Sequence, residues 1–143
     1  MEHPKATISQ VWPYQQDAMN LPVDDLEAAL PFYEQTLGFR LVSRTDTPHQ
    51  SAILARDAIQ LGLVENGGDP AQDGCFFAVD SVERAFAELK ANGLPTDQAQ
   101  YSFQQHGDVR WKVFFVVALD GLCYCYGERQ RANNQLRNSI LTA

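Results

Sequence analysis

Hydrophobic and polar residues alternate over several short stretches of the chain, which is the pattern of half-buried β-strands. In residues 59–64, Ile59, Leu61 and Leu63 share one face of the expected strand. One face of the sheet should therefore meet helices, while the other is free for a second purpose. We expect strands at Ile8–Trp12, Met19–Val23, Phe39–Arg44, Ser51–Ala55, Ile59–Val64, Cys75–Val79, Val109–Val117 and Leu122–Tyr126, and a weaker one at Gln98–Phe103.

Two other segments carry apolar residues at helical spacing. The first runs from about Leu26 to Thr36 and should end at Gly38. Pro31 removes one backbone donor, so we expect a bend in its first turns. The second helix runs from about Val82 to Ala91. Each helix has one apolar face to bury, made of Ala29, Phe32, Tyr33 and Leu37 in the first and of Val82, Ala85, Phe86 and Leu89 in the second.

One phrase of the sequence occurs twice, since Val23–Ala29 (VDDLEAA) is echoed by Val79–Ala85 (VDSVERA). In each copy an apolar strand runs into an Asp that can cap the following helix. Each half then reads strand, helix and three strands, which indicates an internal repeat. We expect an N-terminal extension at 1–17, a single domain at 18–128 made of the repeats 18–65 and 74–128, and a C-terminal tail at 129–143.

The composition of the chain narrows the classes of partner. Its 143 residues with 45% apolar content suit one core. A net charge of −7 repels phosphate backbones and anionic lipids, so we expect no nucleic-acid or membrane partner, and it weakly favours a cationic ligand. No apolar run behind Met1 resembles a signal peptide, which predicts a cytoplasmic protein. Three cysteines, Cys75, Cys123 and Cys125, are expected to be free thiols.

Residues 26–39 (LEAALPFYEQTLGF) resemble the opening phrase of the vicinal oxygen chelate superfamily, the glyoxalase and bleomycin-resistance group. In the second half Val79–Val82 followed by Gly93 fits the same pattern, and residues 118–121 (ALDG) stand where the family usually has Asp-Pro-Asp-Gly. The resemblance covers about Ala18 to Glu128. It implies an α+β fold in which two βαβββ modules form a curled mixed sheet around a cleft, usually in a homodimer.

In metal-using members of that family, four side chains in the cleft hold the ion. Aligned on the two repeats, these positions fall on Ala18, Gln60, Gly74 and Cys125. Ala and Gly offer no donor atom, Gln60 offers a neutral amide oxygen, and only Cys125 is a normal ligand for a transition metal. We therefore expect neither a metal nor another cofactor, which argues against glyoxalase and ring-cleaving dioxygenase chemistry.

The sheet face away from the helices is expected to line the cleft with mostly small residues. Such a cleft, with an amide or two and an aromatic wall, suits a flat organic ligand. Trp111, Tyr101 and His49 are expected at its rim, whereas His106 is assigned to a solvated turn. Alternation assigns to this face Ala18, Asn20, Gln60, Gly62, Gly74, Phe76, Ala78, Cys123, Cys125 and Gly127.

Three classes of function fit these observations. The first is a metal-free protein that binds a small aromatic or cationic organic compound in the cleft, as the resemblance to bleomycin-resistance proteins implies. The second is an enzyme of the family, of lyase or dioxygenase type, that uses a metal or residues the sequence does not identify. The third is a structural or partner-binding module. The missing ligands favour the first class, although the sequence identifies neither a catalytic residue nor the compound.

Overall fold

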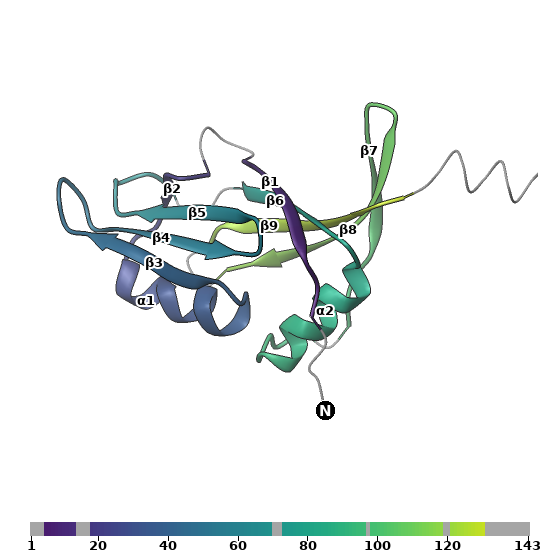
Figure 1. Cartoon of the computed structure of the whole chain (residues 1–143), viewed down its shortest axis with the longest axis horizontal. Helices are drawn as coiled ribbons and strands as arrows, with labels where there is room; N and C mark the ends of the chain where they lie inside the picture. The colour runs from purple at the N-terminus through teal and green to yellow at the C-terminus, as the bar shows by residue number, and fades with distance from the viewer. Residues whose placement is uncertain (1–4, 14–17, 70–72, 97, 119–120, 131–143) are drawn as a thin grey trace, which may run out of the picture.

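The computed structural model describes residues 5–13, 18–69, 73–96, 98–118 and 121–130, which form two β-sheets with their helices on one side (Figure 1). The expected tail from residue 131 onward lies outside these residues, as do positions 119 and 120. In chain order the elements are β1 (Ile8–Pro13), β2 (Leu21–Pro22), α1 (Leu26–Pro31), the π-helix η1 (Phe32–Thr36), β3 (Arg40–Thr45), β4 (Ser51–Arg56), β5 (Ile59–Val64), β6 (Asp73–Val79), α2 (Val82–Ala91), β7 (Ser102–His106), β8 (Val109–Val117) and β9 (Cys123–Arg129).

The two sheets repeat one topology. The four-stranded sheet has the order β2-β5-β4-β3, and the five-stranded sheet contains the equivalent order β6-β9-β8-β7. In both, the first strand of the unit pairs parallel with the last, as in Leu21 opposite Leu63. The predicted α+β fold of two βαβββ units is therefore confirmed. The N-terminal strand β1 adds to the free side of β6 in antiparallel register, so the extension becomes part of the second sheet.

Pro31 divides the first helix into two kinds of turn. The helix begins at the cap Asp25, whose carboxylate accepts a hydrogen bond of 3.3 Å from the Ala28 N–H. Because proline has no N–H to donate, the α-helical ladder is interrupted at Pro31. The chain continues as the π-helix η1, in which the Leu37 N–H donates to the Phe32 carbonyl oxygen at 3.0 Å. The expected bend is thus a change of helix type.

The second helix has a different cap from the expected aspartate. Ser81 Oγ accepts a hydrogen bond of 3.1 Å from the Arg84 N–H and so caps α2. Asp80 Oδ1 instead accepts a hydrogen bond of 2.9 Å from the Thr7 N–H. The repeated phrase therefore keeps the position of both the cap and the helix start, since Ser81 is the repeat equivalent of Asp25, and only the capping residue changes from Asp to Ser. Asp80, the equivalent of Asp24, is left to hold the N-terminal extension.

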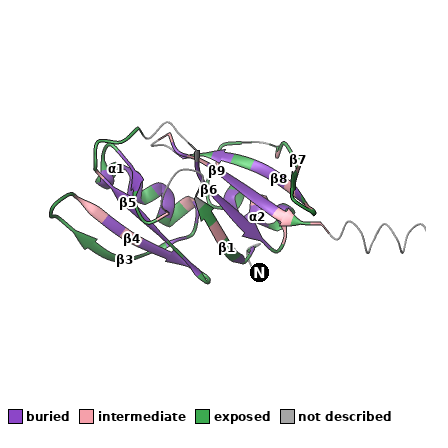
Figure 2. Cartoon of the chain, turned by 90° about the horizontal axis from the view of Figure 1, so that it is seen from above, coloured by how far each residue is buried: buried purple, intermediate pink, exposed green. Residues whose placement is uncertain are grey.

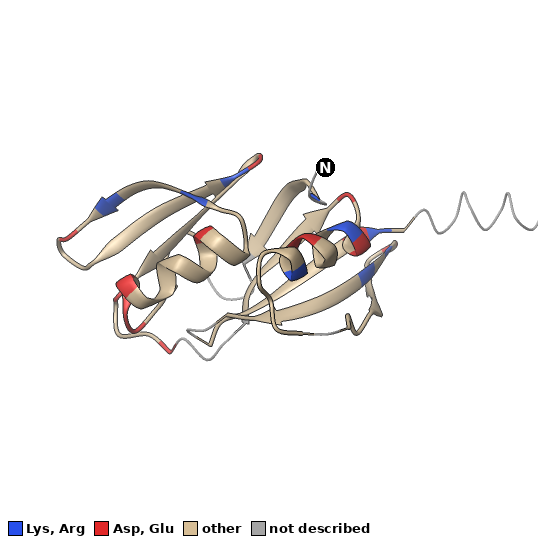
Figure 3. Cartoon of the chain, turned by 90° about the horizontal axis from the view of Figure 1, so that it is seen from below, with Lys and Arg blue, Asp and Glu red and all other residues tan. Residues whose placement is uncertain are grey.

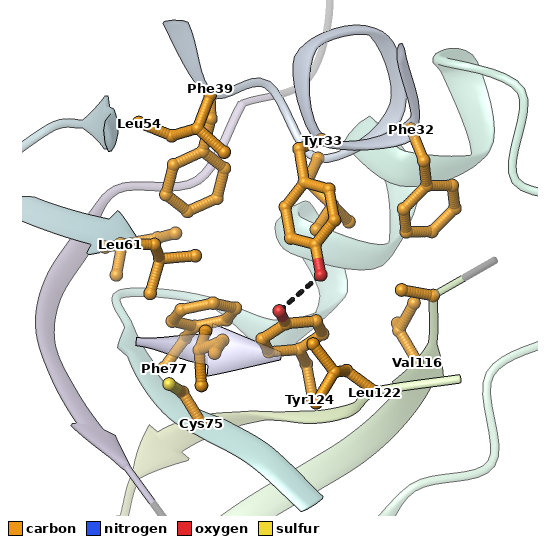
Figure 4. Packing of buried hydrophobic residues seen from close by; sticks show 14 of the residues in the cluster. Phe32, Tyr33, Phe39, Leu54, Leu61, Cys75, Phe77, Val116, Leu122 and Tyr124 are labelled. Carbon is orange, nitrogen blue, oxygen red and sulfur yellow. Dashed lines mark hydrogen bonds between the residues drawn. The ribbon is translucent and has the colours of Figure 1, made fainter. Parts of the chain in front are cut away.

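The main hydrophobic core is shared by both units (Figure 4). Tyr33 of η1 points toward Tyr124 of β9, and their hydroxyl oxygens lie 2.5 Å apart in a buried hydrogen bond. Phe39, just before β3, packs on Phe77 of β6 with ring centroids 5.9 Å apart. Because these contacts join the first unit to the sheet of the second, the two units have no separate cores.

A buried charged cluster also joins the units. The Arg56 side chain at the end of β4 donates to Glu88 Oε1 of α2 at 2.7 Å and to the carbonyl oxygens of Leu37 and Ala6, both at 2.6 Å. Glu88 Oε1 also accepts from the Ala6 N–H at 3.0 Å. One ion pair therefore ties together β4, α2 and the segment that leads into β1.

The strand β3 is exposed along its whole length, whereas most of β4 beside it is buried (Figure 2). Its register with β4 shifts between Leu41 and Ser43. A bulge and charged side chains are common ways to protect a free sheet edge from pairing with another chain, and β3 carries both. None of the described helices is long and apolar enough to cross a membrane.

Candidate functional site

The five-stranded sheet carries a second, smaller apolar cluster on the face turned away from the helices. Alternation along β6, β8 and β9 sends Phe77, Phe114 and Tyr124 into the main core. The intervening residues lie on the opposite face, and this second cluster consists of Phe76, Ala78, Trp111, Val113 and Cys125, with Val109 packed against it. The face that the sequence assigned to a cleft is thus partly filled by large side chains.

Four aromatic rings meet on this face, and each comes from a different strand. Trp12 of β1 lies with its ring centroid 5.1 Å from that of Phe76 and 5.6 Å from that of Trp111. Phe76 and Trp111 are 5.0 Å apart in an edge-to-face arrangement. His106, the last residue of β7, lies 5.4 Å from Phe76. Such tilted and edge-to-face contacts are favourable for aromatic rings, and we call this group the aromatic cluster.

Gly127 makes room for the aromatic cluster. A Cβ atom built at this position would lie 2.2 Å from Cζ of Phe76, closer than any side chain tolerates. Glycine therefore lets the Phe76 ring lie across β9. The sequence placed Gly127 on the free face as one of its small residues, but the space that it leaves is occupied by Phe76.

An open hollow of about 620 Å³ adjoins the aromatic cluster. Arg129 shares its face with Trp111, because the two residues are opposite each other in the β8–β9 register. Gln10 is likewise opposite Ala78 in the β1–β6 register. The hollow is lined by Ser9, Gln10, Trp12, Ala78, Val79, His106, Val109, Trp111 and Arg129.

The charge of the hollow differs from that of the whole chain. Arg129 lines it, and none of its nine lining residues is Asp or Glu. The acidic residues are instead spread over the helices and loops (Figure 3). The net charge of −7 is therefore no property of this site, and the weak indication of a cationic ligand is not supported by the residues that line the hollow.

The expected cleft residues of the first unit do not line this hollow. Ala18 packs against the main core, and its carbonyl oxygen accepts a hydrogen bond of 2.9 Å from the Gly62 N–H. A Cβ atom at Gly62 would lie 2.0 Å from the Met19 carbonyl oxygen, so the backbone of Met19 covers this glycine. Gln60 and Asn20 are exposed. His49, expected at the rim, is exposed in the loop between β3 and β4.

Gly74 faces the opposite side of the sheet from the one predicted. The β6–β9 register shifts between Asp73 and Phe76, so the regular alternation is broken at this point. A Cβ atom at Gly74 would lie 2.8 Å from Cε1 of Tyr124, which belongs to the main core. The prediction that Gly74 opens the cleft is wrong, because this glycine accommodates the Tyr124 ring.

Of the nine residues that line the hollow, sequence reasoning assigned only Ala78 and Trp111 to the cleft or its rim. Trp12 and Gln10 belong to the extension, which lay outside the family resemblance. His106 was assigned to a turn, but it pairs with Val109 across the two-residue connection Gly107–Asp108. A two-residue Gly-Asp connection is a recognised hairpin signal, which would have placed His106 at the end of a strand. Arg129, assigned to the tail, is the last residue of β9.

The four positions expected to hold a metal do not form a metal site. Ala18 packs on the main core, Gly74 meets Tyr124, Gln60 is exposed on β5 and Cys125 is buried in the second apolar cluster. Within the described ranges no group of three or more His, Cys, Asp or Glu side chains could hold a metal ion. These four described positions therefore do not fit a catalytic transition metal.

Comparison with known proteins identifies the family. The model of the Glyoxalase/Bleomycin resistance protein/Dioxygenase superfamily matches residues 15–102. Among solved structures, a bleomycin resistance determinant encoded on the transposon Tn5 is 22% identical with a TM-score of 0.57, and the match covers 81% of this chain and 98% of that one. TnmS3, an antibiotic binding protein from Streptomyces sp. CB03234, is 20% identical with a TM-score of 0.56, and the match covers 82% of this chain and 98% of that one.

A lactoylglutathione lyase from Agrobacterium tumefaciens is 16% identical with a TM-score of 0.57, and the match covers 81% of this chain and 94% of that one. The sequence matches none of the curated proteins. Likenesses at these identities establish the fold, whereas the family match spans more than half of the chain. The chain therefore belongs to the glyoxalase/bleomycin resistance protein/dioxygenase superfamily.

Proposed function

We propose that this protein binds a small, flat aromatic compound in the hollow beside the aromatic cluster, without the help of a metal ion. The observation that carries the proposal is the wall formed by Trp12, Trp111 and His106 next to an open volume of about 620 Å³. This volume lies within the range of roughly 300–1,000 Å³ typical of small-molecule sites. Tryptophan rings present large apolar faces on which a planar ligand can stack.

The side chains around the hollow favour binding over catalysis. His106 is the one histidine among the nine lining residues. Its Nε2 is hydrogen-bonded to Oε1 of the Gln104 amide at 2.8 Å. The lining includes neither a carboxylate nor a thiol that could act with this imidazole as a nucleophile or a second base. The names of two similar structures, a bleomycin resistance determinant and an antibiotic binding protein, also support a binding role.

The same residues favour an aromatic ligand over a cationic one. A cation would lie near the guanidinium group of Arg129 with no lining carboxylate to compensate its charge. Two like charges in a partly enclosed site repel each other more strongly than in bulk water. Of the two ligand classes expected from the sequence, aromatic and cationic, we therefore propose the aromatic one.

Replacing Trp12 by alanine is expected to weaken the binding of N-phenylnaphthylamine, a neutral aromatic probe, at least about tenfold. The loss of one stacking face removes on the order of 1.4 kcal/mol or more of binding free energy. The fluorescence increase of the probe on titration measures the affinity. Ala78→Leu should have the same effect by another route, because Ala78 lines the hollow and a larger side chain would fill it.

The matched control is Phe103→Ala, which removes an exposed ring on β7 that lies beneath the Arg110 guanidinium. Phe103 is opposite Lys112, whose ammonium group pairs with Glu83 of α2, so this ring is on the helix side of the sheet. Phe103→Ala should leave the affinity unchanged. Unaltered binding by folded Trp12→Ala and Ala78→Leu proteins would place the probe elsewhere and refute the proposal.

Native mass spectrometry of the purified protein should give the mass of two chains without the extra mass of a bound metal ion. The homodimer remains a proposal, supported by the exposed apolar side chains of Phe115 and Val117 on β8, which a second copy could cover. The expected lack of metal rests on the scattered positions of Ala18, Gln60 and Gly74. About one transition-metal ion per chain, lost together with stability on chelation, would contradict the metal-free part of the proposal, and a monomer would contradict the dimer.

A further inference from the structure

We propose that the compound carries an anionic group and that the guanidinium group of Arg129 binds this group at the rim of the hollow. The inference rests on the proposed function, since it assumes that the aromatic part of the ligand stacks beside Trp12 and Trp111. It adds the chemical class of the ligand, an aromatic carboxylate or sulfonate.

The position of Arg129 follows from the sheet register. Arg129 of β9 lies opposite Trp111 of β8 and on the same face. Directly opposed residues in an antiparallel pair have Cβ atoms about 4.5–5.5 Å apart. The guanidinium group therefore lies within one side-chain length of the Trp111 ring. A planar ligand against this ring would bring a substituent on its edge toward Arg129.

Arg129 is available to such a ligand because no carboxylate within the described ranges pairs with it. Two other arginines are engaged in ion pairs, Arg56 with Glu88 and Arg44 with Glu27, and Arg110 lies over the Phe103 ring. The neighbouring carboxylate of Glu128 is turned to the helix side, where its Oε1 accepts a hydrogen bond of 3.0 Å from the Val82 N–H. The charge on Arg129 is thus left uncompensated next to an aromatic wall.

The chemistry of the guanidinium group selects the ligand class. Its planar fork can donate two parallel hydrogen bonds to the oxygens of a carboxylate or sulfonate. Gln10 lines the same hollow and has an amide that can donate to a further oxygen of the ligand. The absence of Asp and Glu among the nine lining residues means that nothing there repels an anion. The overall negative charge of the chain acts from greater distance and is weakened by salt.

Two fluorescent probes that differ by one sulfonate group separate the charge from the ring. N-phenylnaphthylamine is neutral, and anilinonaphthalene sulfonate has the same rings with an added sulfonate. The parent protein should bind the sulfonate probe more tightly. Arg129→Gln should weaken the binding of the sulfonate probe about tenfold and change the affinity for the neutral probe less than about twofold. Arg129→Lys keeps the positive charge but lacks the planar guanidinium group. Its affinity for the sulfonate probe should lie between that of the parent protein and that of Arg129→Gln.

Arg110→Gln is the matched control. Arg110 is also an exposed arginine at this end of the sheet, but its guanidinium carbon lies 4.1 Å from the centre of the Phe103 ring on the helix side. This variant removes the same net charge and should leave the affinities for both probes unchanged. An equal loss of sulfonate binding in both variants would mean that net charge, and not a site at Arg129, attracts the probe.

The outcomes for this inference and for the proposed function are distinguishable. If Arg129→Gln leaves sulfonate binding unchanged while Trp12→Ala still weakens the neutral probe, the anionic class is refuted and the aromatic site stands. If Trp12→Ala and Ala78→Leu affect neither probe, the proposed function fails and the assignment of Arg129 fails with it. A tenfold loss confined to the sulfonate probe and to Arg129→Gln supports both.

Discussion

Replacement of Glu88 by alanine is expected to lower the free energy of unfolding by about 3 kcal/mol, because it removes the closer of the two carboxylates that pair with the buried Arg56 guanidinium and leaves only Asp57, whose Oδ2 is 3.2 Å from Nε. Arg56 is 5% exposed and Glu88 is 7% exposed, so water cannot replace the lost partner without a change in the structure. The same substitution removes the hydrogen-bond acceptor of the Ala6 N–H. Ala6 belongs to the segment that leads into β1. Denaturant unfolding followed by tryptophan fluorescence measures the effect.

The control for this variant lies on the same helix. Glu83 of α2 pairs with Lys112, but the Glu83 side chain is exposed and that of Lys112 is partly exposed. An exposed ion pair contributes roughly 0–1 kcal/mol, so Glu83→Ala should cost less than about 1 kcal/mol. If Glu88→Ala costs no more than Glu83→Ala, then the Arg56–Glu88 pair is open to water and does not join the two units.

The second large effect is expected for Phe77→Ala, with a loss of about 3–5 kcal/mol. Phe77 of β6 is fully buried, and its ring lies 5.2 Å from Tyr124 in a stacked arrangement and 5.1 Å from Tyr126. Phe39 contacts the same ring from the first unit. The cavity would therefore lie where the two units meet, and both should unfold in one transition at lower denaturant concentration.

Phe103→Ala removes an identical side chain that is 51% exposed, and it should change stability by no more than roughly 0.5 kcal/mol. The loss of unfolding free energy for Phe86→Ala should lie between those for Phe77→Ala and Phe103→Ala, because Phe86 of α2 is only partly buried against Phe114. Unfolding in two separate steps, with only one step shifted by Phe77→Ala, would contradict the shared core.

The family resemblance and the elements of secondary structure were accessible from the sequence. Alternation predicted the strands at 59–64 and 109–117, and helical spacing predicted the helix at 82–91, all with the observed bounds. The duplicated phrase predicted two units, and the sheet order repeats accordingly. These features depend on residues that are near one another in the chain, and so the local pattern of side chains carries the information.

The composition of the candidate site was decided only by tertiary structure. Counting by alternation placed Gly74 in the cleft, but the register shift in β6 turns it toward Tyr124. The space expected at Gly62 is covered by the backbone of Met19. The alternation of residues along one strand cannot predict a register shift or the covering of a glycine by another segment, because both depend on how one strand packs against another.

The clearest case is Trp12, which belongs to an extension that no motif of the sequence singled out. It reaches Phe76 and Trp111 only because β1 pairs with β6, a contact between distant parts of the chain. The sequence determined which segments become strands and which of their faces are apolar. Which residues from different strands meet around one hollow was decided by strand pairing and register, because these depend on contacts between residues far apart in the sequence.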